Sequence, residues 1–364
     1  MTRARVPLSE YVTEYSVRNK ADEDIPVYSV TNSQGFCTEY FGKEVASKDK
    51  TTYKIVPRGY FAYNPSRINV GSIDWQRHED RVIVSPLYNV FAVSDKMDKQ
   101  YLYYFLRSDI GRQMIQAKAT GSVRDNLKIE MLKEMTVPDM AVDEQRRCAA
   151  VLDRLHGLIV LRQQQLAALD TLIKARFVEM FGDPISNPKG WDSVRLLELG
   201  SCKNGMNFHT DDAGVEVHCL GVGDFKDKSV ISDTSVLPLV SLNEMPSGEY
   251  LLQDGDIVFV RSNGNKALVG RCLAVFPGQI QTTFSGFCIR FRKSSHKVTT
   301  EYLIHVLKTE SMRKKMQGRG ANIQNLNQQI LGSLSIPVPP VDIQNRFSEC
   351  VSQIDKSKLM SRIY

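Results

Sequence analysis

The sequence has no long apolar run, and none of its stretches approaches the roughly 18 consecutive apolar residues that a membrane-spanning helix needs. It begins MTRARVPLSEY, which contains no apolar core of the kind found in secretory signal peptides. Its seven cysteines, an odd number at irregular spacing, are typical of free thiols and not of a disulfide framework. These absences argue against a membrane partner and predict a cytoplasmic protein.

The signatures of several enzyme classes are also missing. No Gly-rich phosphate loop ends in Gly-Lys-Ser or Gly-Lys-Thr, which argues against ATP hydrolysis by this chain. Residues 64–67 (NPSR) come nearest to the loop of amino-methyltransferases but lack the aromatic residue that stacks on a flipped base. Residues 138–146 faintly resemble a metal nuclease but carry no lysine where one is needed. We therefore expect a protein without catalytic residues.

Zinc ligation is not expected either. The candidate ligands are Cys202, His209, His218 and Cys219, and their spacing matches no compact ligand pair. His218 and Cys219 are adjacent, so on a strand their side chains would point to opposite faces. We interpret all four as single buried or surface residues and predict no metal site.

The composition describes a globular protein with room for two domains. The chain has 364 residues, of which 42% are hydrophobic and 24% are charged. This length accommodates two domains of ordinary size and a connecting element. The net charge of +6 permits a nucleic-acid partner without requiring one.

A long helix is predicted between two similar halves of the chain. Asp143 is placed to cap its start, and Gly182 with Pro184 is expected to end it. About 38 residues at roughly 1.5 Å each would make a rod about 57 Å long, which would serve as a spacer. Positions at alternating steps of four and three form a coiled-coil seam: Cys148, Leu152, Leu155, Ile159, Arg162, Leu166, Leu169, Ile173, Arg176 and Met180.

Two arginines interrupt this seam. The aliphatic stems of Arg162 and Arg176 can lie along it while their charged ends reach water, or the arginines can form ion pairs that set the register. A shorter helix is predicted from Asp342 onward, and its Phe347, Val351 and Ile354 supply a second seam. We expect the two helices to pack together as an antiparallel pair.

The predicted elements occur in the same order on both sides of the long helix. Each side has strand-like runs, then a helical pattern, a loop with Gly and Asn, and a short edge segment before a helix. On the first side the strands are expected at 27–30, 53–56, 60–63 and 82–84, the helix at 96–118 and the edge segment at 135–138. On the second side the strands are expected at 215–222, 250–252, 257–260, 268–275 and 287–291, the helix at 301–316 and the edge segment at 334–337.

An internal duplication explains this order. Residues 121–147 align with residues 320–346 without a gap, and nine of the 27 positions are identical. Chance would supply about two identities, so the alignment indicates a repeat. Two copies of one unit, each followed by a helix, predict a pseudo-twofold molecule of the α+β class.

Each copy carries a loop rich in planar, hydrogen-bonding side chains at the matching place. Such side chains suit DNA, because Arg and Lys can pair with guanine edges, Asn with adenine, and Ser or backbone amides with phosphates. An ordinary polar turn is the alternative, and the duplication favours a function. The candidates in these loops are Asn64, Ser66, Arg67 and Asn69 in the first copy, and Arg261, Ser262, Asn263, Asn265 and Lys266 in the second.

A second, basic segment follows the predicted helix in each copy. Basic residues at 313–319 in the second copy and at Lys118 in the first can clamp phosphates, or can simply balance the helix dipole and stay solvated. The candidates for DNA contact here are Arg124 and Asn126 in the first copy, and Arg319, Asn322, Gln324 and Asn325 in the second.

Over nearly its whole length the chain resembles the specificity subunits of type I restriction-modification systems. The motifs that carry the resemblance are residues 63–71 (YNPSRINVG), 255–263 (GDIVFVRSN), 321–326 (ANIQNL), 336–340 (IPVPP) with Gln344, 173–184 (IKARFVEMFGDP) and 187–191 (NPKGW). The combination is specific although each piece alone is weak.

The resemblance implies two target-recognition domains, each reading half of a split site on double-stranded DNA. It also implies that the helices bind modification (methyltransferase) subunits and that a separate restriction subunit cuts DNA. S-adenosylmethionine, ATP and Mg²⁺ would then belong to those partners and not to this chain. Its expected parts are recognition domain 1 (1–141), the spacer helix (142–182), recognition domain 2 (183–341) and a distal helix (342–364).

This chain departs from the family pattern in one respect and leaves other functions open. The distal helix is much shorter than the central one and is poorly patterned after Ile354, which puts a full-length helix pair in doubt. Two other functions are a scaffold whose two units bind proteins, and an enzyme that restricts or methylates DNA alone, against which the missing motifs argue. The target sequence does not follow from the residues, because docking geometry decides which side chain meets which base.

Overall fold

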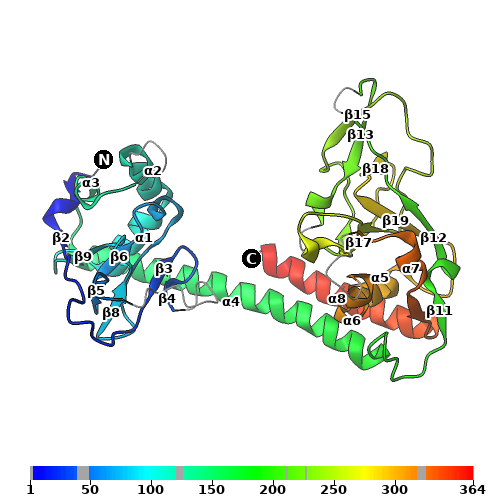
Figure 1. Cartoon of the computed structure of the whole chain (residues 1–364), viewed down its shortest axis with the longest axis horizontal. Coiled ribbons are helices and arrows are strands. Elements are labelled where there is room, and N and C mark those ends of the chain that lie inside the picture. The colour runs from blue at the N-terminus through cyan, green and yellow to red at the C-terminus, as the bar shows by residue number, and fades with distance from the viewer. Residues whose placement is uncertain are drawn as a thin grey trace. The chain divides into compact units, whose positions relative to one another are not determined.

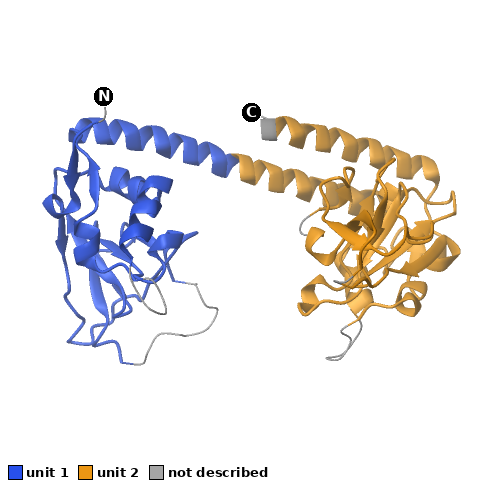
Figure 2. Ribbon diagram, turned by 90° about the horizontal axis from the view of Figure 1, so that it is seen from above, with its two compact units in different colours: residues 1–161 blue, residues 162–364 orange. Residues whose placement is uncertain are grey.

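The computed structural model describes residues 3–38, 49–119, 126–209, 212–225, 228–317 and 325–363. The chain divides into two compact units, residues 1–161 and residues 162–364 (Figure 2). Both combine strands and helices (Figure 1), and the predicted α+β class is confirmed. The predicted domain bounds and the pseudo-twofold relation stay predictions. In the described ranges, no helix is long and apolar enough to cross a membrane.

Unit 1 is built on a four-stranded sheet in the order β2-β9-β6-β7. Its strands are β1 (Arg5–Pro7), β2 (Val12–Glu14), β3 (Ser29–Thr31), β4 (Gly35–Cys37), β5 (Lys54–Pro57), β6 (Phe61–Tyr63), β7 (Ile73–Trp75), β8 (Arg81–Val84), β9 (Asn89–Val93) and β10 (Thr136–Pro138). Its helices are α1 (Lys99–Arg107), α2 (Asp109–Lys118), α3 (Ile129–Lys133) and the first half of α4 (Val142–Phe181), with short 3₁₀ turns η1 (Leu8–Glu10) and η2 (Ile68–Val70). Helix α1 contacts β7.

Unit 2 repeats this plan with a five-stranded sheet in the order β12-β19-β16-β17-β14. Its strands are β11 (Ser193–Arg195), β12 (Gly200–Asn204), β13 (Val215–Leu220), β14 (Val230–Ile231), β15 (Leu239–Leu242), β16 (Asp256–Val260), β17 (Cys272–Val275), β18 (Thr282–Phe284), β19 (Cys288–Lys293) and β20 (Ser335–Pro337). Its helices are α5 (Thr300–Lys308), α6 (Glu310–Gln317), α7 (Gln328–Gly332) and α8 (Val341–Ile363), with 3₁₀ turns η3 (Leu196–Glu198), η4 (Val222–Asp224) and η5 (Lys266–Leu268). Helix α5 contacts β16 and β17.

The structure corrects three details of the predicted elements. The helix expected at 96–118 is two helices, because Ser108 is extended and its hydroxyl accepts the Gly111 N–H (3.1 Å) at the start of α2. The helix expected at 301–316 breaks in the same way at Thr309. The strand expected at 250–252 is wrong, since this segment is a turn in which the Tyr250 N–H bonds to the Ser247 carbonyl (2.9 Å).

Helix α4 runs without interruption from Val142 to Phe181. Asp143 therefore lies inside the first turn, where its charge interacts favourably with the helix dipole and pairs with Arg146 (3.2 Å), so it is not the capping residue that was predicted. Gly182 ends the helix as expected: it has φ 78° and donates its N–H to the Val178 carbonyl (2.8 Å).

Within unit 2, the second half of α4 packs against α8 in the antiparallel sense. The Phe347 ring lies 5.5 Å from the Phe181 ring, and further along α8 the Lys358 ammonium lies 2.7 Å from the Asp170 carboxylate. Ile173 is buried, and Leu166 and Leu169 are half-buried. The remaining predicted contact residues of α8, Val351 and Ile354, are buried in the same core.

A buried glutamine joins each long helix to its own unit. The Gln145 amide, on α4, accepts the N–H of Asp98 (2.8 Å) and donates to the Met140 carbonyl (2.8 Å). The Gln344 amide, on α8, accepts the N–H of Thr299 (2.8 Å). Asp98 and Thr299 are the N-cap residues of α1 and α5, so the start of each long helix is tied to the helix that covers the sheet.

Candidate nucleic-acid interface

In unit 1 the candidate loop connects β6 to β7. The Asn64 side-chain oxygen accepts the Ser66 N–H (3.0 Å), which turns the chain sharply after the strand. Ile68 is buried and anchors the loop, whereas Ser66 and Arg67 are exposed and Asn69 is half-buried. Local turn chemistry therefore presents polar side chains while one apolar residue holds the loop in place.

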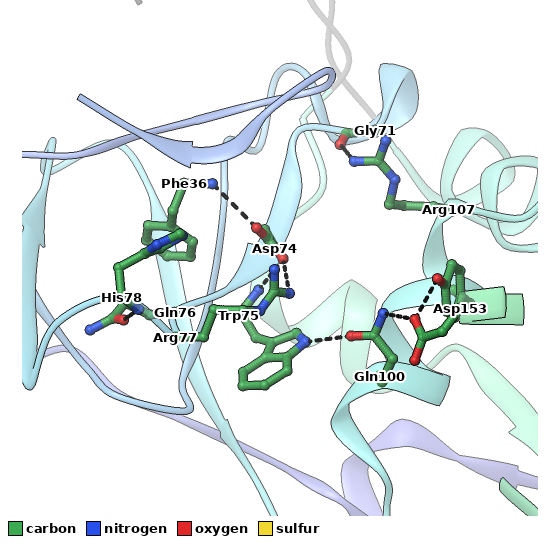
Figure 3. A network of polar contacts seen from close by, with 11 residues as sticks. Phe36, Gly71, Asp74, Trp75, Gln76, Arg77, His78, Gln100, Arg107 and Asp153 are labelled. Carbon is green, nitrogen blue, oxygen red and sulfur yellow. Dashed lines mark hydrogen bonds and ion pairs between the residues drawn. The ribbon is translucent and has the colours of Figure 1, made fainter. Parts of the chain in front are cut away.

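Side chains of α1 hold the end of this loop. Gly71 has φ 94°, and its carbonyl accepts a hydrogen bond from Arg107 (2.9 Å), as Figure 3 shows. A second nitrogen of the Arg107 guanidinium donates to the Asn32 carbonyl (2.7 Å). Because the Arg107 side chain fixes its end, the loop has its conformation before any ligand binds.

A second group of polar contacts lies around β7, the strand that follows the loop, and reaches α4 (Figure 3). Asp74 is buried, accepts the Phe36 N–H (3.2 Å) and pairs with Arg77 (2.8 Å). Burial raises the pKa of the Asp74 carboxyl, and the Arg77 guanidinium opposes that shift. Next to it, the Trp75 indole donates to Gln100 (3.1 Å), and the Gln100 amide donates to Asp153 of α4 (2.8 Å). The strand after the candidate loop is thus linked to the long helix.

The second predicted segment of unit 1 lies against the loop. The Ser66 hydroxyl bonds to the Asn126 side chain (2.5 Å), and the Leu127 N–H donates to the Pro65 carbonyl (3.1 Å). Below them, the Tyr63 hydroxyl donates to the Leu127 carbonyl (3.0 Å). Arg124 lies outside the described residues. Two segments 60 residues apart in the sequence therefore form one polar surface.

Unit 2 repeats this pairing between β16 and β17. Ser262 forms an antiparallel bridge with Asn325, and the Leu326 N–H donates to the Arg261 carbonyl (2.8 Å). This bond matches the one from Leu127 to Pro65 in unit 1. The predicted residues Arg319, Asn322 and Gln324 lie outside the described residues.

The polar side chains of the unit 2 loop differ in their exposure to solvent. Asn263 and Asn265 each accept a backbone N–H two residues further on (2.8 and 3.0 Å), and Asn265 and Lys266 are exposed. Arg261 is half-buried and donates one hydrogen bond to the Gly286 carbonyl (3.3 Å). A shallow hollow beside them is lined by Val222, Ser262, Asn263, Gly264, Phe287 and Asn325.

The basic segment after α5 is partly engaged within the protein. Arg313 donates to the Ala267 carbonyl (2.9 Å) and so supports the loop, while Lys314 is exposed and pairs with Glu310 (2.6 Å). In unit 1 Lys118 pairs with Glu134 (2.7 Å). Each of these three side chains therefore already has a partner within the protein, with which a DNA phosphate would compete.

Sequence reasoning missed two exposed residues at this edge. Phe287 lines the hollow and is 61% exposed, and Leu87 of unit 1 is 76% exposed. The sequence places Phe287 only at the start of the expected strand 287–291 and assigns Leu87 to no element, so neither residue stands out as a site residue.

The apolar seam residues in the first half of α4 are mostly exposed, whereas those in the second half are buried or half-buried. Leu152, Leu155 and Ile159 are 39%, 51% and 55% exposed. Arg162 is exposed and bonds to Gln165 one turn on (2.8 Å), so its guanidinium engages its own helix. An apolar stripe on α4 is thus available for contact with another molecule.

Three of the four residues considered for zinc, Cys202, His218 and Cys219, have other surroundings in the structure. Burial raises the pKa of the Cys202 and Cys219 thiols to about 12, so both remain protonated at neutral pH. His218 Nδ1 lies 2.9 Å from the Leu237 carbonyl. Among the described residues, no group of three or more His, Cys, Asp or Glu side chains could hold a metal ion.

The fold and these surfaces define a duplicated binding protein: two related units, each with a loop and a distant segment combined into one polar surface, and each followed by a long helix. Residues 188–364 match the family model of the type I restriction modification DNA specificity domain. This match lies within unit 2 and identifies a DNA specificity domain in that part of the chain.

Individual relatives are similar to the chain over a larger part of its length. The chain is 25% identical over 274 residues to the type I restriction enzyme StySPI specificity subunit of Salmonella potsdam, an alignment that covers 70% of this chain and 58% of the relative. It is 24% identical to the MjaVIII specificity subunit of Methanocaldococcus jannaschii, over 71% of this chain and 64% of the relative. The alignments thus span less than two thirds of either relative.

A solved structure has the same fold. The crystal structure of a type I restriction-modification S subunit from M. genitalium superimposes with a TM-score of 0.54 at 14% identity, covering 100% of this chain and 94% of that chain.

Proposed function

We propose that this chain is the DNA-reading subunit of a type I restriction-modification complex and that each unit reads one half of a two-part target. The observation that carries the proposal is the repeated surface in which Ser66 meets Asn126 in unit 1 and Ser262 meets Asn325 in unit 2. Its exposed residues supply donors and acceptors suited to base edges and phosphates. The chain itself is non-catalytic. Its partner subunits bind S-adenosylmethionine, ATP and Mg²⁺, and the complex works in the cytoplasm.

The contact residues proposed are those of the two loops and the segments that join them. One Arg261 donor is used by the Gly286 carbonyl, but a guanidinium has five N–H groups and can still meet a guanine in bidentate fashion. In unit 1 the exposed Arg67 occupies the same loop. Arg124, Arg319, Asn322 and Gln324 stay in the proposal on sequence grounds.

The long helices are the proposed docking elements for the modification subunits. The exposed apolar stripe of Leu152, Leu155 and Ile159 offers a surface of the kind that helices bury against one another. We propose that α4 also serves as the spacer between the two readers.

Binding to DNA at several salt concentrations tests the proposal. Fluorescence anisotropy with the modification subunits present should show site-selective binding that weakens with salt, by about 0.9 in the logarithmic slope for every phosphate neutralised. Equal affinity for all sequences would contradict a specificity role. Binding with little salt dependence would instead favour a protein scaffold.

Removing one loop arginine should affect one half-site only. We expect Arg261→Ala to lose about 1–3 kcal/mol of discrimination at one half of the target, and Arg67→Ala to lose as much at the other half, because each contact belongs to its own unit. Competition binding against duplexes mutated in either half measures this.

Arg58→Ala is the matched control, because Arg58 is exposed and precedes β6, at the strand end opposite to the loop. It should leave discrimination unchanged. If Arg67→Ala or Arg261→Ala weakened binding to all duplexes equally, the loops would be general phosphate clamps.

A further inference from the structure

Each unit exposes a large apolar side chain at the same position of the same turn. In unit 1 residues 85–88 form a β-turn closed by the bond from the Tyr88 N–H to the Ser85 carbonyl (3.0 Å). In unit 2 residues 285–288 form one closed by the bond from the Cys288 N–H to the Ser285 carbonyl (2.8 Å). The third residue of each turn is the exposed one, Leu87 at 76% and Phe287 at 61%.

Strand pairing places both turns beside the candidate loops. In unit 1 the turn leads into β9, and Asn89 at its start pairs with Tyr63, the last residue of β6 before the loop. In unit 2 the turn leads into β19, and Cys288 pairs with Val260, the last residue of β16. Because the strands are antiparallel, the apolar turn and the polar loop lie at the same end of the sheet in each unit.

In unit 2 the turn and the loop are also bonded to each other. The Phe287 carbonyl accepts the N–H of Arg261 (2.8 Å) and that of Ser262 (3.4 Å). The Phe287 side chain lines the shallow hollow with Ser262, Asn263 and Asn325. A base edge that met these polar groups would therefore also meet the ring of Phe287.

An exposed apolar residue on its own needs no explanation, because such residues are common on protein surfaces. Two of them at one turn position in both copies, each beside the polar surface, are harder to attribute to chance. Neither Leu nor Phe can hydrogen-bond through its side chain. The apolar group that a base edge offers in the major groove is the C5-methyl of thymine, and Phe is suited to contact it.

We infer that Phe287 and Leu87 are specificity-determining residues, each contacting a thymine methyl group in the half-site read by its own unit. The inference rests on the proposed function and adds a chemical class of base contact to it. It requires one thymine in each half-site whose methyl group contributes to affinity.

Replacing thymine by deoxyuridine removes only that methyl group and so provides the test. A target is first selected from randomised duplexes with the full chain and its modification subunits, and each thymine is then replaced singly. The wild-type complex should lose affinity about fourfold at one thymine per half-site, the effect of burying one methyl-sized group at about 0.8 kcal/mol. Phe287→Ala should abolish that loss in one half-site, and Leu87→Ala should abolish it in the other.

Phe276→Ala is a matched control. Phe276 is 37% exposed and directly follows β17, so it lies at the opposite end of that strand from the loop. It should retain the wild-type deoxyuridine profile.

Three results would overturn the inference. A wild-type complex insensitive to deoxyuridine throughout its target would show that no methyl group is read, while sequence-selective binding would leave the proposed function intact. Equal weakening of thymine and deoxyuridine duplexes by Phe287→Ala would indicate a wedge between bases instead. A selection that enriches no sequence would contradict the proposed function itself, and the inference with it.

Discussion

Phe347→Ala is expected to lower the free energy of unfolding of unit 2 by about 3–5 kcal/mol. Phe347 on α8 is fully buried, and its ring lies 5.6 Å from that of Phe177, 5.5 Å from that of Phe181 and 5.0 Å from that of His305. Those residues belong to α4 and α5. Truncation would leave a cavity where three helices meet, and packed aromatic rings cannot collapse to fill it.

The loss should be confined to unit 2, because the two units have separate buried cores. Trp75 lies in unit 1 and Trp191 in unit 2, and these are the only two tryptophans of the chain. Urea titration of Phe347→Ala in a Trp75→Phe background therefore reports unit 2 alone. In that background the midpoint of the Trp191 fluorescence transition should fall.

The matched control places the same change in the other core. Phe91 is fully buried in unit 1, so Phe91→Ala in a Trp191→Phe background should lower the transition reported by Trp75. If Phe347→Ala lowered both transitions by the same amount, the units would unfold as one body and the description of two independent cores would be wrong.

The sequence predicted the class and the duplication because the repeated residues are those that the fold buries. Leu127 and Leu326 are identical in the two copies and fully buried, and so are Leu132 and Leu331. Buried positions tolerate few side chains, so two copies of one unit keep them alike and leave a detectable pattern. The long helix was predictable for a related reason, because its apolar positions follow the helical period.

What the sequence could not predict depends on contacts between distant segments. The bond between Ser66 and Asn126 requires the loop after β6 and the segment before α3 to meet, and no local pattern encodes this. The extended residue Ser108, which divides one expected helix into two, makes a side-chain cap that periodicity does not reveal. Exposed residues such as Phe287 have no periodic constraint, so their place at the candidate surface emerges only from strand pairing.

Gln344→Ala is expected to lower the free energy of unfolding of unit 2 by about 2–4 kcal/mol, although the change removes a polar side chain. The Gln344 side chain has no exposed surface. Its oxygen accepts the Thr299 N–H (2.8 Å), and its nitrogen donates to the carbonyls of Lys297 (2.9 Å) and Pro339 (2.8 Å). Alanine would leave these three backbone groups without their partner, and burying unpaired polar groups is costly.

Gln329→Ala is the matched control for this change. Gln329 lies on α7 in the same unit and is exposed, so its replacement should alter stability by no more than about 0.5 kcal/mol. Urea titrations followed by Trp191 compare the two variants. Equal stability of Gln344→Ala and Gln329→Ala would mean that water replaces the lost bonds and that the buried amide does not stabilise the joint.

The equivalent residue of unit 1 extends the prediction to the other joint. The buried Gln145 accepts the Asp98 N–H (2.8 Å) and donates to the Met140 carbonyl (2.8 Å) and the Lys96 carbonyl (3.4 Å). Since the bonding pattern is the same, Gln145→Ala should destabilise unit 1 as Gln344→Ala destabilises unit 2. The Trp75 transition should move for the first variant and the Trp191 transition for the second, because each amide ties a long helix to its own unit.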